Sequence, residues 1–193
     1  MSRDEAGVMA VRTLLWRRLD RPGHESARLV WHQPFWQLSG TAVWSHDGTV
    51  CRLEYAVACD AGWLTRHAWV TGWVGPRHVR VDLLALTDRR WRLDGRACPA
   101  VDGCPDVDLS FTPSTNLLPV RRLGLAVGEE AAVRAAWLSF PALTLAPLDQ
   151  VYRRTGAATY QYRAGNDETA VELEIDPDGI VRRYPGLWQL EAG

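Results

Sequence analysis

Two aspartates separated by one residue are the feature of this sequence best suited to chemistry. Asp106 and Asp108 flank Val107, so on an extended strand both carboxylates point to the same face. Like charges held close together raise one of the two pKa values, as a general acid and base pair requires. Aspartates also anchor turns and pair with arginines in many structural sites. Structural, ligand-binding and catalytic roles therefore stay open for this pair.

A strong turn signal follows the two aspartates. Residues 112–116 read Thr-Pro-Ser-Thr-Asn, a run of turn-forming residues, and Arg121 and Arg122 come next. A turn there would fold the arginines back toward the aspartates, and the guanidinium fork matches a carboxylate in shape and charge. We therefore expect Asp106 or Asp108 to pair with Arg121 or Arg122, away from bulk solvent.

The sequence contains no familiar catalytic or metal-binding motif. It lacks a Gly-x-Ser-x-Gly nucleophile elbow, a phosphate-binding glycine loop and a dinucleotide-binding fingerprint. Its five histidines are scattered without metal-ligand spacing, although Asp102 near the aspartate pair leaves a hard-cation site open as an alternative. From these patterns we predict no catalytic residue, metal ligand or cofactor, and an enzyme is the less favoured alternative.

Composition and charge are those of a globular protein without affinity for nucleic acid. The chain has 193 residues, 47% of them hydrophobic, and a net charge of -1, which suits one domain over residues 1–193. Its 22 basic residues are all arginines, scattered rather than clustered. The acidic start does not resemble a secretory signal, and no stretch approaches the roughly 18 apolar residues of a membrane span. We expect a soluble cytoplasmic protein without a transmembrane segment and with an undetermined oligomeric state.

The cysteines are expected to be reduced in that compartment. Their number is even, but no two of them form a Cys-x-x-Cys zinc pair. We predict plain buried thiols at Cys51, Cys59, Cys98 and Cys104.

Alternating polarity and regularly spaced turn signals predict an all-β fold, mainly antiparallel and with little helix. The clearest alternation runs over residues 51–57 and 171–175, and Asp-Gly pairs mark turns at 47–48 and 94–95. The segment 129–138 fits either a strand or a helix, and we leave it open. The other expected strands are 12–19, 27–32, 36–45, 65–74, 78–86, 107–111, 143–146, 148–154, 159–163 and 180–184.

Most aromatic residues here carry a polar group. The chain has ten tryptophans and five tyrosines but only three phenylalanines, which favours surfaces that are apolar and also bind through hydrogen bonds. Alternation over residues 65–73 places one mixed set on a common face: Thr65, His67, Trp69, Thr71 and Trp73. This face is either a wall that contacts a ligand or a core strand whose polar groups are satisfied locally.

Short motifs occur in a fixed order along nearly the whole chain. They lie at residues 15–20 (Leu-Trp-Arg-Arg-Leu-Asp), 22–25 (Pro-Gly-His-Glu), 106–113 (Asp-Val-Asp-Leu-Ser-Phe-Thr-Pro), 115–116 (Thr-Asn), 118–119 (Leu-Pro), 121–123 (Arg-Arg-Leu), 140–141 (Phe-Pro), 150–153 (Gln-Val-Tyr-Arg) and 179–188 (Gly-Ile-Val-Arg-Arg-Tyr-Pro-Gly-Leu-Trp). In this set and order the chain resembles the bacterial putative glycolipid-binding family. That pattern usually has Phe where this chain has Ser114, and we expect looser packing there.

The resemblance implies a many-stranded antiparallel β roll, an open barrel-like sheet similar in shape to the bacterial lipoprotein carriers, which hold acyl chains in a β-walled cavity. It implies no catalytic residues. The leading hypothesis is therefore a protein that binds a glycolipid or another lipid-like amphiphile, with an apolar cavity for the chain and a polar rim of Arg, Asp and Trp. The candidate ligand-binding residues are Arg66, Trp69, Asp106, Asp108, Asn116, Arg121, Tyr152 and Tyr184.

These candidates have distinct expected roles. Arg66 and Arg121 would pair with an anionic or polyhydroxyl head group, Trp69 would stack on a sugar, and the carboxylates would accept hydroxyl protons. One alternative is an enzyme of glycolipid or sugar-phosphate metabolism that uses Asp106 and Asp108 as acid and base. Another is a protein-interaction module with an exposed aromatic patch. A closed apolar cavity would favour the amphiphile-binding protein, and a cleft with two carboxylates would favour the enzyme. A flat patch would favour the protein-interaction module.

Overall fold

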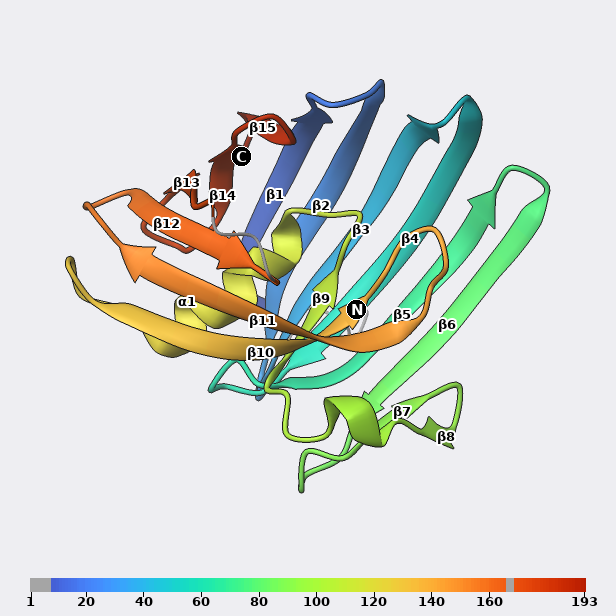
Figure 1. Ribbon diagram of the computed structural model, residues 1–193, viewed down its shortest axis with the longest axis horizontal. Helices are drawn as coiled ribbons and strands as arrows, with labels where there is room; N and C mark the ends of the chain where they lie inside the picture. Colours follow the sequence, from blue (N-terminus) through green and yellow to red (C-terminus); the bar gives the residue numbers. More distant parts are fainter. Residues whose placement is uncertain (1–7, 166–168) are drawn as a thin grey trace, which may run out of the picture.

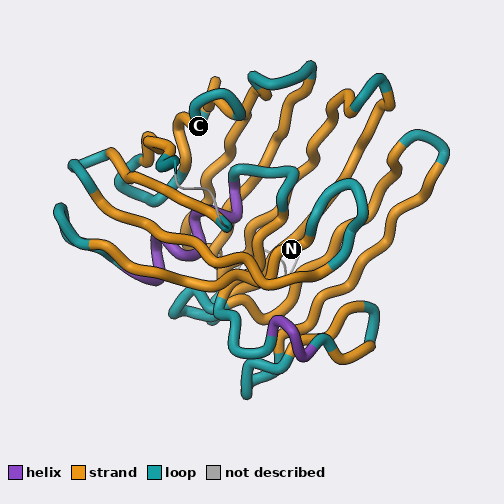
Figure 2. The backbone as a smooth tube through the Cα atoms, in the orientation of Figure 1, coloured by secondary structure: helices purple, strands orange, loops and turns teal. Residues whose placement is uncertain are grey.

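A single rolled sheet dominates the structure, a computed structural model that describes residues 8–165 and 169–193. Strands make up 60% of it and helices 7%, which confirms the all-β prediction (Figure 1, Figure 2). The sheet has 15 strands within the described residues, in the order β8-β7-β6-β5-β4-β3-β2-β1-β15-β14-β13-β12-β11-β10-β9, and it does not close into a barrel.

The first six strands form an antiparallel meander. A two-residue turn at Asp47 and Gly48 joins β3 to β4, and both residues have positive φ angles of 49° and 78°. This is the backbone that Asp-Gly favours in a tight hairpin, because glycine has no Cβ to clash there. The strands are β1 (Val8–Arg18), β2 (Gly23–His32), β3 (Phe35–His46), β4 (Thr49–Cys59), β5 (Thr65–Val74) and β6 (Arg77–Ala85).

The rest of the chain extends both ends of this meander. The last strand, β15, pairs with β1, so the C-terminal strands continue the same sheet, while β9 pairs in parallel with β10 at the far edge. The remaining elements are β7 (Trp91–Leu93), β8 (Arg96–Ala97), η1 (Pro99–Val101), β9 (Asp106–Leu109), η2 (Ser114–Asn116), α1 (Leu117–Leu123), β10 (Glu130–Leu138), β11 (Leu145–Arg154), β12 (Thr159–Ala164), β13 (Val171–Ile175), β14 (Val181–Tyr184) and β15 (Trp188–Ala192).

Some regions were left open by the sequence or differ from the sequence-based expectations. The open segment 129–138 is the strand β10, which pairs with β11 along its whole length. The two strands expected at 143–146 and 148–154 are one strand, β11, which runs through Pro147. The helix α1 was not predicted: it has Pro119 in its first turn, where a missing N–H does no harm, and it ends at Gly124 with a φ of 56°.

The interior of the roll is packed with side chains. Figure 1 shows α1 lying between the strands β1–β5 and the strands β10–β12. Leu117 and Leu118 of α1 join a buried cluster with Trp44, Leu53 and Phe111, while Val120 packs in a second cluster with residues of β11 and β12. The helix therefore fills the space that the curvature of the sheet encloses.

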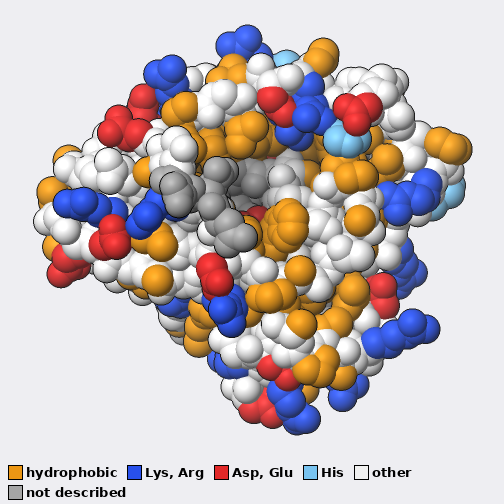
Figure 3. Space-filling view, viewed as in Figure 1, with side chains coloured by type: hydrophobic (Ala, Val, Ile, Leu, Met, Phe, Trp, Pro, Cys, Tyr) orange, Lys and Arg blue, Asp and Glu red, His pale blue; other side chains and the backbone are white. Residues whose placement is uncertain are grey.

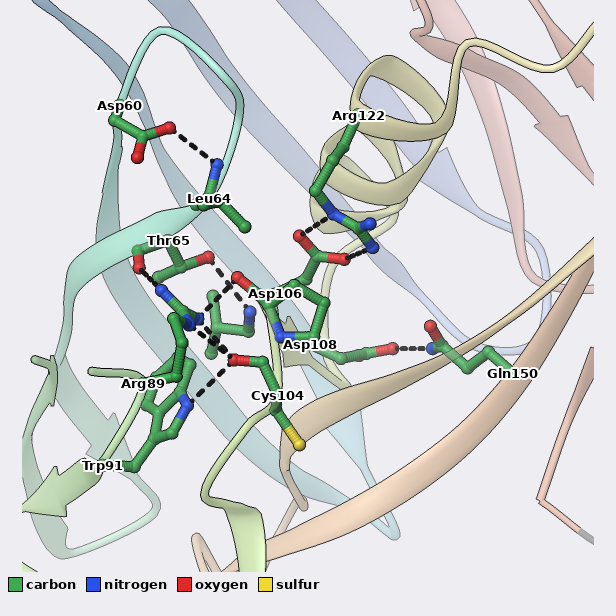
Figure 4. Close-up of polar contacts among 12 residues, drawn as sticks. Asp60, Leu64, Thr65, Arg89, Trp91, Cys104, Asp106, Asp108, Arg122 and Gln150 are labelled. Carbon is green, nitrogen blue, oxygen red and sulfur yellow. Dashed lines mark hydrogen bonds and ion pairs between the residues drawn. The ribbon is translucent and has the colours of Figure 1, made fainter. Parts of the chain in front are cut away.

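A seam of hydrogen bonds holds the edge strand β9 against β5. Thr65 donates its backbone N–H to the Pro105 carbonyl at 3.1 Å, and its hydroxyl accepts the N–H of Val107 at 3.1 Å. Arg89 donates to the carbonyls of Thr65 and Pro105 at 2.7 Å each, and also to the carbonyl of Cys104 (Figure 4). These bonds keep the two sides of the roll together where the strand ladder is absent.

The cysteines are free thiols. Cys51, Cys59 and Cys104 are buried as expected, while Cys98 is partly exposed. Burial raises the pKa of Cys59 to about 12, so this thiol is unreactive at neutral pH. No helix in the described part of the chain is long and apolar enough to cross a membrane.

Candidate functional site

One hollow gathers a carboxylate, an amide and several aromatic rings. We call it the carboxylate pocket; it has a volume of about 150 Å³. Figure 3 shows one face of the molecule, which is hollowed near its centre with hydrophobic side chains beside the hollow. The polar and aromatic residues that line the pocket include Asp108, Asn116, Trp137, Tyr162, Tyr184 and Trp188.

Asp108 reaches the pocket from the edge strand β9. Its Oδ2 atom accepts a hydrogen bond from Gln150 Nε2 at 2.6 Å (Figure 4), and the same amide nitrogen lies 3.0 Å from the Tyr162 hydroxyl oxygen. Burial raises the pKa of Asp108 to about 6, the hydrogen bond from Gln150 opposes this rise, and the charge of Asp106 adds to it. The carboxylate is therefore charged at neutral pH but titrates just below it.

Asn116 lines the same pocket from the short helix η2. The residue is 7% exposed, and its side-chain amide makes no hydrogen bond to any residue that the structure describes. Buried side-chain amides normally have a partner in the protein or in bound water. The Asn116 amide is therefore available to bind a ligand with both a donor and an acceptor.

Three tyrosines pack in series behind and beside the carboxylate. The rings of Tyr152 and Tyr162 have centroids 4.8 Å apart, and those of Tyr162 and Tyr184 are 6.0 Å apart at an interplanar angle of 78°. Tyr162 and Tyr184 line the pocket, whereas Tyr152 is fully buried behind them. Burial raises the pKa values of Tyr152 and Tyr162, so both phenols stay neutral.

Trp188 lines the pocket, and its ring also contacts the guanidinium of Arg18. The guanidinium carbon of Arg18 lies 4.7 Å from the Trp188 centroid and 5.7 Å from that of Trp44. Asp20 accepts two hydrogen bonds from Arg18, at 2.9 and 3.0 Å. Arg18 is thus held by its own partners and does not line the pocket.

The predicted pairing of an aspartate with an arginine is confirmed for Asp106 and Arg122. The guanidinium donates to both carboxylate oxygens, at 3.1 and 2.6 Å, and only 3% of the Asp106 side chain is exposed (Figure 4). Asp106 does not line the carboxylate pocket. The two aspartates therefore have different surroundings: one is bound by Arg122, and the other faces the pocket.

The other predicted residues lie elsewhere. Arg121 sits over the ring of Trp63 at 5.1 Å and lines a different hollow near Gly179. Arg66 donates two hydrogen bonds to Asp60, at 3.0 and 2.7 Å. The structure therefore brings Asp108, Asn116 and Tyr184 together, places Tyr152 behind them, and leaves both arginines outside.

Trp69 belongs to the outer face of the sheet. It lies in β5 opposite Ala56 and Asp82 and lines an open hollow of about 290 Å³ with Ser26 and Ser39. From His67 to Trp73 the mixed face is half-buried rather than part of the core, and Trp69 within it lines this hollow. Its first member, Thr65, is buried at the seam with β9.

Sequence reasoning missed a buried polar cluster next to the pocket. Glu25 is completely buried, and its Oε1 atom accepts hydrogen bonds from the hydroxyls of Tyr55 at 2.5 Å and Thr112 at 2.6 Å. Its Oε2 atom has no partner among the described residues. Burial raises the pKa of Glu25 to about 7. The signal was present, because Glu25, Ala27 and Leu29 share the inward face of one alternating strand.

Ser114 belongs to this cluster. Its hydroxyl lies 2.6 Å from the Tyr55 hydroxyl and 2.7 Å from that of Thr112, and the residue is buried. The place where looser packing was expected is therefore occupied by a hydrogen-bond network. Thr112 also lines the carboxylate pocket, so it joins the cluster to the pocket wall.

Within residues 8–165 and 169–193, no group of three or more His, Cys, Asp or Glu side chains could hold a metal ion. Asp102, considered above as a cation ligand, accepts the backbone N–H of Trp91 at 2.8 Å. This bond ties the short strand β7 to the turn after η1.

Comparisons with known proteins agree with this fold. Residues 13–190 match the family described as Putative glycolipid-binding. The chain is similar to a DUF1089 family protein from Pseudomonas aeruginosa, whose crystal structure has a TM-score of 0.74 and 31% sequence identity and covers 94% of this chain and 92% of that one. It also shares its fold with a beta-barrel-like protein of the domain of unknown function DUF1849 from Brucella abortus, with a TM-score of 0.55, 12% identity and coverage of 97% and 98%. No curated protein matches the chain. Because the matched residues span most of its length, this chain belongs to the Putative glycolipid-binding family.

Proposed function

We propose that the protein binds a glycolipid or a similar amphiphile and holds its head group in the carboxylate pocket. One observation carries this proposal: Asp108 and the unbonded amide of Asn116 face a hollow walled by aromatic rings. A few placed polar groups within an aromatic wall are the usual composition of a small-molecule site. The family description supports the same class of ligand.

The pocket chemistry suits a sugar ring. A carboxylate accepts hydroxyl protons, and an amide both donates and accepts, so Asp108 and Asn116 together match adjacent hydroxyls. The rings of Trp137 and Tyr184 supply flat apolar surfaces against which the C–H face of a sugar can lie. The polar groups would orient the sugar ring, and the aromatic rings would supply most of its contact area.

The size of the pocket restricts what it can hold. Its volume of about 150 Å³ is half of the roughly 300 Å³ at which pockets for drug-sized ligands begin. It therefore fits a head group rather than an acyl chain. Leu148 and Leu187 also line the pocket, and we propose that the first methylene groups of the chain lie against them.

The geometry favours binding over two-carboxylate catalysis. An acid and base mechanism with Asp106 and Asp108 needs both groups to reach the substrate. Arg122 occupies both oxygens of Asp106, outside the pocket. Asp108 is left without a second free carboxylate beside it.

Thermal unfolding tests the proposal with octyl β-glucoside, glucose and octanol, each below the concentration at which micelles form. A ligand at a hundredfold excess over its Kd stabilises the native state by about 2.7 kcal/mol. Each kcal/mol moves the midpoint by about 2–4 °C at this size. We therefore expect octyl glucoside to raise Tm by about 5–11 °C, and glucose or octanol to raise it much less.

Two tryptophan variants locate the site. Trp137→Ala removes a ring from the pocket, so it should abolish most of the shift caused by octyl glucoside. Trp69→Ala removes the same ring from the outer face, and it should leave the shift unchanged. No shift in the unmodified protein, or an equal shift in Trp137→Ala, would contradict the proposal.

A further inference from the structure

We infer that the carboxylate pocket selects head groups that carry a positively charged nitrogen and disfavours head groups whose net charge is negative. This inference rests on the proposed function, since it concerns the same pocket. It reverses the role expected for Arg66 and Arg121, which were to bind an anionic head group.

Among the described residues that line the pocket, the only charged side chain is an acid. Asp108 lies in the wall of the pocket, and the described residues that line the pocket include no Arg, Lys or His. An anionic head group would meet this carboxylate without a counter-ion, and burying such a charge unpaired is unfavourable. An ammonium group would instead neutralise Asp108.

Two arginines that contact neighbours of the pocket residues already have partners of their own. Arg122 is bound to both oxygens of Asp106. Arg18 is bound to Asp20 and also contacts the rings of Trp44 and Trp188. To bind a phosphate, either arginine would have to abandon a partner and leave a carboxylate unpaired, which is costly for a buried group such as Asp106.

The aromatic rings add a second attraction for a cation. Trp137, Tyr162, Tyr184 and Trp188 line the pocket together, and the faces of such rings attract ammonium groups, most strongly where water is displaced. Trp188 already has the guanidinium of Arg18 at 4.7 Å from its centroid. Several rings beside one carboxylate form the kind of cage that binds alkylated ammonium groups.

Asp108 also keeps an oxygen for the ligand. Gln150 occupies Oδ2, and Oδ1 makes no hydrogen bond within the described part of the chain. This oxygen can accept an N–H of a primary ammonium or face a quaternary one directly. The groups around it are neutral or anionic: the phenols of Tyr152 and Tyr162, the amide of Gln150, and Asp106 on the same strand.

Calorimetric titration with amphiphiles that share one octyl chain tests the inference, with all probes below micelle concentrations. The heads are trimethylammonium, glucosaminide, phosphocholine, glucoside and phosphate. We expect the trimethylammonium probe to bind at least about tenfold more tightly than the phosphate. The glucosaminide and phosphocholine arms then show whether an amino sugar or a zwitterionic lipid head supplies the positive nitrogen. Equal binding of the ammonium and phosphate probes would overturn the inference.

Two variants identify the carboxylate responsible. Asp108→Asn keeps the shape of the side chain and removes its charge, so the ratio of ammonium to phosphate affinity should fall toward one. Asp149→Asn removes the same charge from an exposed position paired with Arg134, outside the pocket, and should leave the ratio unchanged. An unaltered ratio in Asp108→Asn would overturn the inference.

A pH series on the unmodified protein gives an independent measurement. Octyltrimethylammonium is charged at every pH, and Asp108 has a pKa of about 6. The affinity of the protein for octyltrimethylammonium should therefore fall about tenfold between pH 7.5 and pH 5, while its affinity for the neutral glucoside changes little. Binding of the glucoside without charge selection would reject the inference alone, whereas failure of every probe would reject the proposed function as well.

Discussion

At the scale of single residues, Glu25 makes stability depend on pH. Its pKa in the folded protein is about 7, against an ordinary value of 4.5, so the folded state binds the proton more tightly than the unfolded state. The stability that this proton contributes is complete below about pH 4.5 and is lost as the pH rises through 7. The difference of pKa corresponds to about 3 kcal/mol.

Glu25→Gln should remove this dependence, because it keeps an acceptor for Tyr55 and Thr112 without an ionisable proton. We expect the native protein to lose about 3 kcal/mol more than the variant between pH 4.5 and pH 8. Urea unfolding of both proteins across this range measures the difference. Parallel stability curves would show that Glu25 is solvated or stays charged in the folded state.

The ion pair of Asp106 and Arg122 should be far more important for stability than an exposed pair. Arg122→Ala would leave a buried carboxylate without its cation, which costs about 3–5 kcal/mol. Arg134→Ala is the matched control: Arg134 and Asp149 are 60% and 68% exposed, and such a pair contributes about 0–1 kcal/mol. Denaturant unfolding of the two variants decides the matter, and equal losses would mean that Asp106 is reached by water.

At the scale of elements, Arg89 joins two strands that have no ladder between them. Arg89→Met keeps much of the side-chain length but removes donors to the carbonyls of Thr65, Cys104 and Pro105. We expect a loss of about 1–3 kcal/mol, since buried carbonyls would lose their partners. Hydrogen exchange should also accelerate in β9 more than in the central strands. Arg90→Met, at an exposed neighbour, should change neither quantity.

The strands were the most predictable elements, because alternation is visible wherever one face of a strand is buried. In β4 and β13 the buried positions alternate as expected. The strands β7 and β8 have only three and two residues, too few to establish a period. The helix α1 was missed because Leu117, Leu118, Pro119 and Val120 are all buried, so no polar face reveals a helical repeat.

The candidate site was only partly predictable for a different reason. Asp108 and Asn116 lie close in sequence, and their types pointed to polar contacts. Trp137, Tyr162 and Trp188 come from β10, β12 and β15, and only the curl of the sheet brings them to the same hollow. Glu25 was missed because its role depends on Tyr55 and Thr112, 30 and 87 residues away in sequence.

At the scale of the whole molecule, the pairing of β1 with β15 joins the two halves of the sheet. Residues 15 and 192 are partners in this pairing, so one ladder depends on a contact across almost the whole chain. The carboxylate pocket depends on the same arrangement, since Trp188 pairs with Arg18 and lines the pocket. The pocket is therefore a product of long-range pairing rather than of any local motif.

The open ends of the sheet bear on self-association. A long free edge is a template for another chain, and this is how many β proteins begin to aggregate. Here the edge strands β8 and β9 have only two and four residues. The edge strand β9 also carries two acidic side chains. Thr65 already binds a backbone N–H of β9, and Arg89 already binds the backbone carbonyl of Pro105, just before the strand. Although the sheet has 15 strands within the described residues, it thus offers a neighbouring molecule very little backbone with which to extend it.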